Sequence, residues 1–335
     1  MRLTTGMVLI VALAVLAVAG CGQPPAPTAT APGPRRLVIE VLRFNEYSDY
    51  YAAHITALTR ALTDAGYREN RDFVINARSA QNELSNVPQI IDAAVAAQPD
   101  LIITLQGPLL FTALKKAPAI NKLFAIITDP LVLGAGSSDT SHLPHVTGIY
   151  EADPIAALFD AVRQCTPRPT RIGTIFMVGD AESVFVKEQM AKLASERGLT
   201  LVAQPYTAPG EITEALRALT SQQVDALIPI SDAYQDIVYT LMAKLSADQR
   251  LPLFAFWHYP GSTAALVCAN GTEADEVATF AELAVRILKG EDPAQIPFVN
   301  MGQGPATLTV YEPNARAVGL TVPAAVRQHA TIITQ

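Results

Sequence analysis

From residue 37 onward, short runs of apolar, β-branched residues alternate with longer stretches whose apolar residues recur at helical spacing. This alternation predicts parallel strands covered by helices. In the first half, strands are predicted at 37–42, 72–77, 99–105 and 122–130, with helices near 87–97 and 109–115. The second half repeats the pattern, and its predicted strands are 171–178, 199–206, 224–230 and 250–260.

The two halves also match in detail. Gly66 and Gly198 each close a helix directly before the second strand of their half, where glycine tolerates the left-handed conformation of a helix end. The phrase PDLII in the first half has its counterpart in VDALI in the second. These similar halves predict an α/β fold of two Rossmann-like lobes, each with a parallel sheet, joined by a multi-strand hinge.

The order of the elements predicts three crossings between the lobes. The first is VTGIYEADP at 146–154, and the second lies near 264–270, because the predicted helix at 273–288 is left over once the second lobe is complete. The third precedes the strand at 307–311. We therefore expect lobe 1 to contain residues 36–150 with about 268–304, and lobe 2 to contain 151–267 with about 305–335.

The N-terminal segment has the layout of a secretory signal peptide. A basic residue, Arg2, is followed by an apolar run from Met7 to Ala19, which as a helix spans roughly 20 Å and is too short to cross a bilayer. The residues before Cys21 resemble the bacterial lipobox, which implies that residues 1–20 are removed and Cys21 is lipidated; an ordinary cleavage site beside an incidental cysteine is the alternative. Residues 21–35 are rich in proline and predict an extended tether.

Composition narrows the range of partners. Loss of Arg2 with the leader leaves 23 of the 24 basic residues against 31 acidic ones, a net charge of −8, and no dense basic stripe is present. Nucleic acid is therefore not an expected partner. Cys165 and Cys268 either form a disulfide outside the cytoplasm or remain two buried thiols, and the sequence leaves both alternatives open.

In open parallel sheets, ligands bind outside the carboxyl ends of the strands. With two lobes facing each other, both sets of strand ends border one cleft. The residues predicted to bind a ligand there are Phe44, Glu46, Tyr47, Thr104, Gln106, Asp129, Glu182, Ser183, Asp232 and Trp257.

Several of these residues also have a purely structural interpretation. Asp129 precedes a proline and is either a turn cap or a cleft residue, and Asp232 is either a helix N-cap or a charge in the cleft. Glu46 is equally well a solvated residue. Ser183 opens a helix whose free N–H groups favour a ligand carboxylate. Trp257 lies either in the core or in an aromatic wall with the histidine and tyrosine that follow it.

Motifs for catalysis are weak. The chain has no G-x-S-x-G elbow and no phosphate-binding G-x-x-x-x-G-K. His142 and His145 have a spacing seen in metal sites, but they lie in a predicted loop with serine and proline. Asp129 and Asp232 lack an accompanying nucleophile. We therefore predict no catalytic residue, no metal and no cofactor.

The chain resembles the solute-binding lipoproteins of bacterial ABC importers, in the family that includes tryptophan and phenylalanine binders. The resemblance runs from about residue 37 to the end and rests on phrases such as LTDAGYRENRDFVINARSAQNE, RIGTIFMVGDAESV and VDALIPISD. It implies a periplasmic-binding-protein type I fold that closes over a small ligand. Where such proteins commonly carry an amide, this chain has Glu182 in the run Asp180-Ala181-Glu182-Ser183. An added acid suits an extra amine on the ligand.

The leading hypothesis is a lipid-anchored, monomeric protein outside the cytoplasm that captures a small, amine-bearing solute and delivers it to a membrane permease. Asp232 with Glu182 or Glu46 would meet the amine. A lipoprotein that presents its closed form to a signalling receptor is the alternative. An extracytoplasmic α/β enzyme is a third hypothesis.

Overall fold

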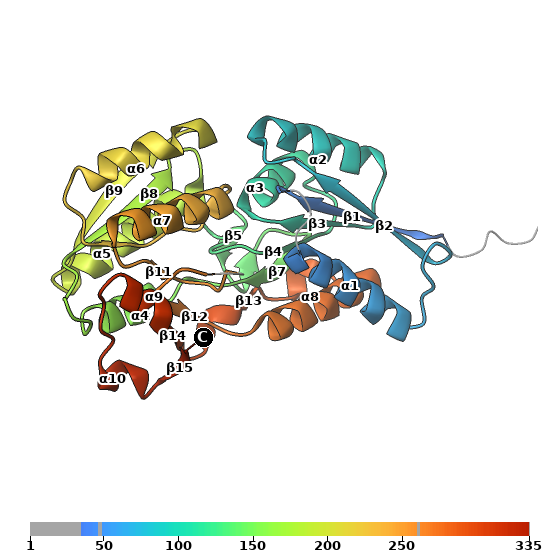
Figure 1. Ribbon diagram of the computed structural model, residues 1–335. Coiled ribbons are helices and arrows are strands. Elements are labelled where there is room, and N and C mark those ends of the chain that lie inside the picture. The colour runs from blue at the N-terminus through green and yellow to red at the C-terminus, as the bar shows by residue number, and fades with distance from the viewer. Residues whose placement is uncertain (1–34, 46–48, 260–261, 335) are drawn as a thin grey trace, which may run out of the picture. The chain divides into compact units, whose positions relative to one another are not determined.

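The computed structural model describes residues 35–45, 49–259 and 262–334 (Figure 1). Its helices and strands alternate along the chain in two α/β lobes, which confirms the predicted fold class. Residues Arg36–Gln335 form one compact unit that contains both lobes.

The first lobe is built on a six-stranded sheet with the order β13-β7-β4-β3-β1-β2, and all its pairs are parallel. The register places Arg43 beside Leu105, and Leu105 beside Ala125. The carboxyl ends of β1, β3 and β4 therefore lie side by side. The strands are β1 (Leu37–Arg43), β2 (Phe73–Ser79), β3 (Leu101–Leu105), β4 (Lys122–Ala125), β7 (Val146–Tyr150) and β13 (Val299–Asn300).

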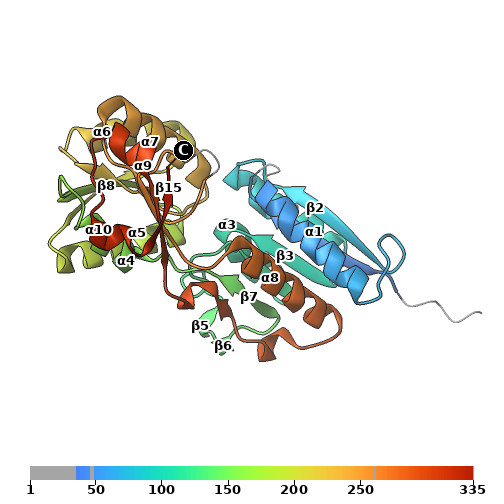
Figure 2. The ribbon, with the colours of Figure 1, turned by 60° about the horizontal axis from the view of Figure 1, so that its bottom comes forward.

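Helices cover both faces of this sheet because alternate strand residues point to opposite sides. Val41 packs in a core cluster with Leu58 of α1 (Asp49–Asp64) and Phe280 of α8 (Glu273–Leu288). Its neighbour Leu42 belongs to a cluster with residues of α2 (Val87–Ala96) and α3 (Gly107–Lys116). Figures 1 and 2 show α1 and α8 side by side, although more than 200 residues separate them in the chain.

The second lobe has the strand groups β10-β8-β9 and β11-β12-β14-β15, which a bridge between Leu227 and Leu253 connects. Among the named strands that the structure describes in this lobe, β12 and β14 pair in the antiparallel sense and the other pairs are parallel. The strands are β8 (Arg171–Met177), β9 (Thr200–Tyr206), β10 (Ala226–Leu227), β11 (Phe254–Ala255), β12 (Leu266–Ala269), β14 (Thr307–Tyr311) and β15 (Ala330–Ile333). The helices are α4 (Ile155–Val162), α5 (Ala181–Glu196), α6 (Ile212–Thr220), α7 (Gln235–Gln249), α9 (Glu312–Ala317) and α10 (Ala324–Arg327).

Two segments predicted as crossings are largely strands. Val146–Tyr150 forms β7 in the first sheet, and Leu266–Ala269 forms β12 in the second. Both runs are apolar and their backbones pair with neighbouring strands, which satisfies N–H and C=O groups that a buried linker would leave unpaired. A short hairpin, β5 (Gly136–Ser138) with β6 (Ser141–His142), was not predicted.

The crossing segments meet where the first sheet gives way to the second. Asn270 Nδ2 donates to the carbonyl of Ala152 at 2.8 Å. A Cβ on Gly302 would lie 2.9 Å from Asn270 Nδ2 and 3.1 Å from the Ala152 oxygen, so a larger residue would crowd these two segments. The hinge is therefore packed tightly.

Candidate functional site

Unpaired acceptors gather at the carboxyl ends of β1 and β3. Thr104 and Gln106 are at least nine-tenths buried, and their atoms Oγ1 and Oε1 have no hydrogen-bond partner in the described structure. Asn45 Oδ1, two residues beyond β1, is likewise buried and unpartnered. Because Arg43 pairs with Leu105, these atoms belong to neighbouring strand ends. Buried polar atoms without partners are costly, and their concentration at one edge marks a place where ligand groups can bind.

Backbone strain occurs at the same edge. Gln106 has φ +94° and Ile126 has φ +59°, each directly after a strand of the first sheet. The left-handed region is unfavourable for residues with a Cβ, most of all for a β-branched one, and costs on the order of 1–3 kcal/mol. Strain of this kind is concentrated at binding sites, where the surrounding structure holds it in place.

Glu182 bridges the two lobes. It is the second residue of α5 in lobe 2, and its Oε1 accepts the N–H groups of Thr128 at 2.6 Å and Asp129 at 3.1 Å, which follow β4 in lobe 1. Its Oε2 lies against Gly107, where an added Cβ would overlap that oxygen and lie 3.1 Å from Cδ. The lobes are thus in direct contact through one buried carboxyl group.

Asp180 and Ser183 organise the turn from β8 to α5. Asp180 is the N-cap of α5, and its Oδ1 accepts the N–H groups of Glu182 at 2.9 Å and Ser183 at 3.3 Å, while Oδ2 accepts that of Ala233 at 3.1 Å. Ser183 Oγ accepts the N–H of Met177. The helix N–H groups that the sequence left for a ligand carboxylate are instead bonded to Asp180.

Asp232 is not the N-cap of α7, which is Tyr234, and its carboxyl group bonds the turn before that helix. Its Oδ1 accepts the N–H of Tyr234 at 2.8 Å, in the turn that precedes α7. Its Oδ2 accepts the hydroxyl of Tyr206 at 2.6 Å, and the residue is 7% exposed at the strand end. Asp129 likewise caps its turn, because Oδ1 accepts the N–H of Leu131 at 2.8 Å.

Burial raises the pKa of all four carboxyl groups of this site. Desolvation, with the nearby Asp180 charge, raises the pKa of Glu182 to about 8, and desolvation raises that of Asp232 to about 7. Desolvation also raises the pKa of Asp180 and of Asp129. Among the described residues, no basic side chain contributes to the pKa of any of the four. The site therefore concentrates acid groups without cationic partners, which favours a cation.

Aromatic and amide contacts also connect the lobes. Phe44 is fully buried and meets Tyr234 edge to face, with ring centroids 5.6 Å apart. Asn45 Nδ2 donates to Asp236 Oδ2 at 3.0 Å. On the side of lobe 2, Trp257 lies 5.8 Å from the Tyr259 ring, which stacks on Tyr239 at 3.8 Å. Trp257 therefore belongs to an aromatic group beyond β11 and also packs against the core of lobe 2.

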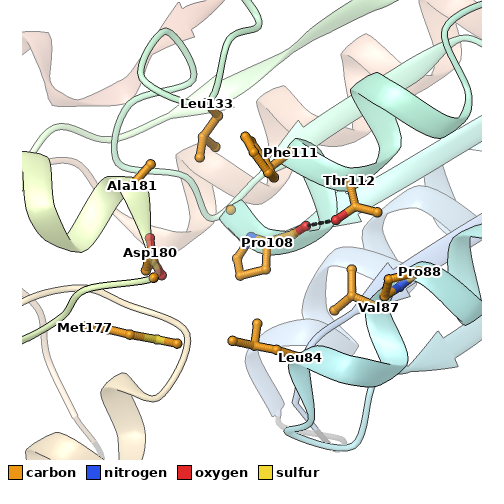
Figure 3. A pocket seen from close by; sticks show the side chains of 12 residues that line it. Leu84, Val87, Pro88, Pro108, Phe111, Thr112, Leu133, Met177, Asp180 and Ala181 are labelled. Carbon is orange, nitrogen blue, oxygen red and sulfur yellow. Dashed lines mark hydrogen bonds between the residues drawn. The ribbon is translucent and has the colours of Figure 1, made fainter. Parts of the chain in front are cut away.

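An apolar cavity of about 170 Å³ lies beside the carboxyl groups (Figure 3). Figure 3 shows Met177 and Leu84 pointing toward each other across it. Its lining shares Gly107 and Asp180 with the acidic site, but contains none of the ten residues predicted to bind a ligand. The lining residues are Leu84, Val87, Pro88, Gly107, Pro108, Phe111, Thr112, Leu133, Met177, Gly179, Asp180 and Ala181.

Some predicted site residues cannot be compared with the structure, and the structure adds others that were not predicted. Cys21, Glu46 and Tyr47 are outside the described residues. The sequence prediction missed Tyr206 and Asp236. Tyr206 ends β9, so the strand-end rule applied to that strand would have found it.

The two histidines with metal-like spacing have structural contacts. His142 stacks on Phe298 at 4.2 Å, and His145 Nδ1 lies 2.9 Å from Asn121 Oδ1. No group of three or more metal-ligating side chains occurs in the part of the chain that the structure describes.

The two cysteines that the structure describes, Cys165 and Cys268, are both buried and unpaired. In the same ranges, none of the helices is both long and apolar enough to cross a membrane.

Comparisons with known proteins agree with this architecture. A tyrosine-binding protein of Clostridioides difficile (strain R20291) is 23% identical over 245 residues, which cover 73% of this chain and 70% of the relative. The structure of an ABC domain in complex with L-Trp from Streptococcus pneumonia has a TM-score of 0.79 at 19% identity, and covers 89% of this chain and 100% of that one. The ligand-free, open structure of a substrate binding protein from Clostridium difficile has a TM-score of 0.63 at 19% identity, with 89% and 99% covered.

The profile of the ABC transporter substrate binding proteins matches residues 39–333, nearly the whole described chain. Proteins of this family bind small molecules outside the cytoplasm and are not a class of enzymes. The match confirms the resemblance found in the sequence. The chain belongs to the family of ABC transporter substrate-binding proteins.

Proposed function

We propose that this chain is the solute-binding lipoprotein of an ABC importer, anchored through Cys21, and that it captures a small amine-bearing solute and delivers it to a membrane permease. The ligand would lie between the lobes, among the strand-end residues Phe44, Glu46, Tyr47, Thr104, Gln106, Asp129, Glu182, Ser183, Asp232 and Trp257.

One observation supports an amine above other groups. Thr104 Oγ1, Gln106 Oε1 and Asn45 Oδ1 are buried acceptor atoms without partners, at the edge where the carboxyl groups converge. An ammonium group offers up to three N–H donors and a positive charge, and it therefore satisfies both features. The carboxyl groups would ionise when the cation binds, because an opposite charge favours their charged form.

The apolar cavity supports an apolar portion of the same solute. Its walls include Leu84, Phe111 and Met177, and it adjoins Gly107, which contacts Glu182. Burial of apolar surface contributes roughly 25 cal/mol per Å². Two relatives, a tyrosine-binding protein and a protein in complex with L-Trp, are consistent with a solute that joins an amine to an aromatic ring.

Thermal-shift screening of the purified chain tests this proposal. We expect amines with an apolar or aromatic group to raise the melting temperature, and sugars and nucleosides without an amine to leave it unchanged. Asp232→Asn should weaken amine binding at least tenfold, because it removes a buried charge, whereas the exposed control Glu214→Gln should not. A panel in which only uncharged solutes bind would refute the proposal.

A further inference from the structure

Backbone donors at the strand ends of the cleft are bonded to the chain's own carboxyl groups. Seven N–H groups, from three different loops, are satisfied in this way. Glu182 accepts those of Thr128 and Asp129; Asp129 accepts that of Leu131; Asp180 accepts those of Glu182, Ser183 and Ala233; and Asp232 accepts that of Tyr234. These N–H groups are the usual binding partners of a ligand carboxylate, and here each already has an acid as its partner.

Three side-chain atoms at this edge that can accept hydrogen bonds have no partner. Asn45 Oδ1 and Gln106 Oε1 are amide oxygens, which only accept, and Thr104 Oγ1 has two lone pairs. Gln106 directly precedes Gly107, whose Cα carries no side chain and lies against Glu182 Oε2. These three acceptor atoms therefore have room for a donor, while the seven backbone N–H groups named above are already bonded to carboxyl groups.

We infer that the solute is an organic cation that carries no carboxylate, and that Glu182 is the residue that excludes one. This inference rests on the proposed function and narrows its ligand class. An amino acid that placed its carboxylate at the N–H groups after β4 or at the start of α5 would have to displace Glu182 or Asp180, which already bond these groups. The corresponding amine avoids this cost and retains its ammonium group.

Glu182 differs from the other three acids because its bonds cross between lobes. Asp180 and Asp232 accept N–H groups of their own lobe, and Asp129 that of its own turn. Removal of the Glu182 side chain would vacate the N–H groups of Thr128 and Asp129 without uncapping a helix. These two donors converge on one point, since both bond a single oxygen. They would then bind a ligand carboxylate.

Matched pairs of an amine and its parent amino acid test the inference. Titration calorimetry would compare tryptamine with tryptophan, tyramine with tyrosine, and cadaverine with lysine on the purified chain. We expect the amine of the best-binding pair to bind at least tenfold more tightly than its amino acid. Glu182→Ala should shift that ratio at least tenfold toward the amino acid. Glu188→Ala, an exposed acid on the same helix, should leave the ratio unchanged.

Glu182→Gln provides the second variant. Its amide oxygen still accepts the N–H groups of Thr128 and Asp129, so it should retain the discrimination against a carboxylate even though the charge is lost. If an amino acid binds the wild-type chain as tightly as its amine, the inference is overturned while the proposed function stands. A ratio that Glu182→Ala does not change would do the same. If no amine and no amino acid binds, the proposed function fails and the inference fails with it.

Discussion

Gly107→Ala should weaken closure of the lobes, and a second substitution, Glu182→Ala, should remove that effect. Gly107 is the first residue of α3 and has no positive φ, so alanine suits its backbone and improves helix propensity. The obstacle is Glu182, whose Oε2 occupies the position of the new methyl group. The carboxyl group would have to leave, and its bonds to the N–H groups of Thr128 and Asp129 would break.

Each of these two bonds is worth about 1–1.5 kcal/mol net, so the loss is about 2–3 kcal/mol. If closure over the ligand needs this contact, the ligand affinity of Gly107→Ala falls roughly 30- to 150-fold. In a Glu182→Ala background, Gly107→Ala should cost close to nothing, since the methyl group then meets no carboxyl oxygen. A double-mutant cycle in titration calorimetry measures the coupling. A coupling energy below about 0.5 kcal/mol would refute the role given to this contact.

Further predictions concern pH, thiols and the anchor. Burial raises the folded-state pKa of Asp153 to about 8 and of Glu151 to about 7, above their unfolded values near 4. The stability that these two groups contribute is therefore complete below about pH 4 and is lost as the pH rises through 7–8. The melting temperature of the wild-type chain should fall from pH 5 to pH 8.5, and that of Asp153→Asn should fall less steeply. An equal slope in the two chains would contradict this prediction. Burial raises the pKa of Cys165 to about 11 and of Cys268 to about 12, so neither should react with a thiol reagent until the chain unfolds. Cys21→Ala should move the exported chain from the membrane fraction to the soluble fraction; persistence in the membrane would count against lipidation.

The alternation of strands and helices was sufficient to predict the architecture. The predicted helix 273–288 and strand 307–311 match α8 and β14, because both have strong periodicity and clear ends. The segments of β7 and β12 were predicted only as crossings between the lobes, because an apolar run next to a crossing has no periodicity that distinguishes a strand from a buried connection.

The candidate site was predictable only as a set of strand ends. That rule selects Thr104 and Gln106 at the end of β3, and Asp232 in the loop between β10 and α7, since it needs no knowledge of side-chain contacts. It did not predict which acid bonds which N–H group. The bond from Thr128 to Glu182 joins residues 54 positions apart in two lobes, and it depends on how α5 faces the loop after β4. The left-handed backbone of Gln106 likewise follows from tertiary packing, since glutamine has no local preference for it.

Proton release on binding tests most directly the claim that the cleft receives a cation. Glu182 and Asp232 have pKa values raised to about 8 and about 7, so below pH 7 both are largely protonated in the ligand-free chain. A bound cation favours their ionised forms. For the best-binding amine, calorimetry in buffers of different ionisation enthalpy should therefore show proton release near pH 7 and an affinity that rises from pH 6 to pH 8.5. Proton uptake, or an affinity that falls over this range, would contradict the account, because it is the behaviour of an anionic ligand.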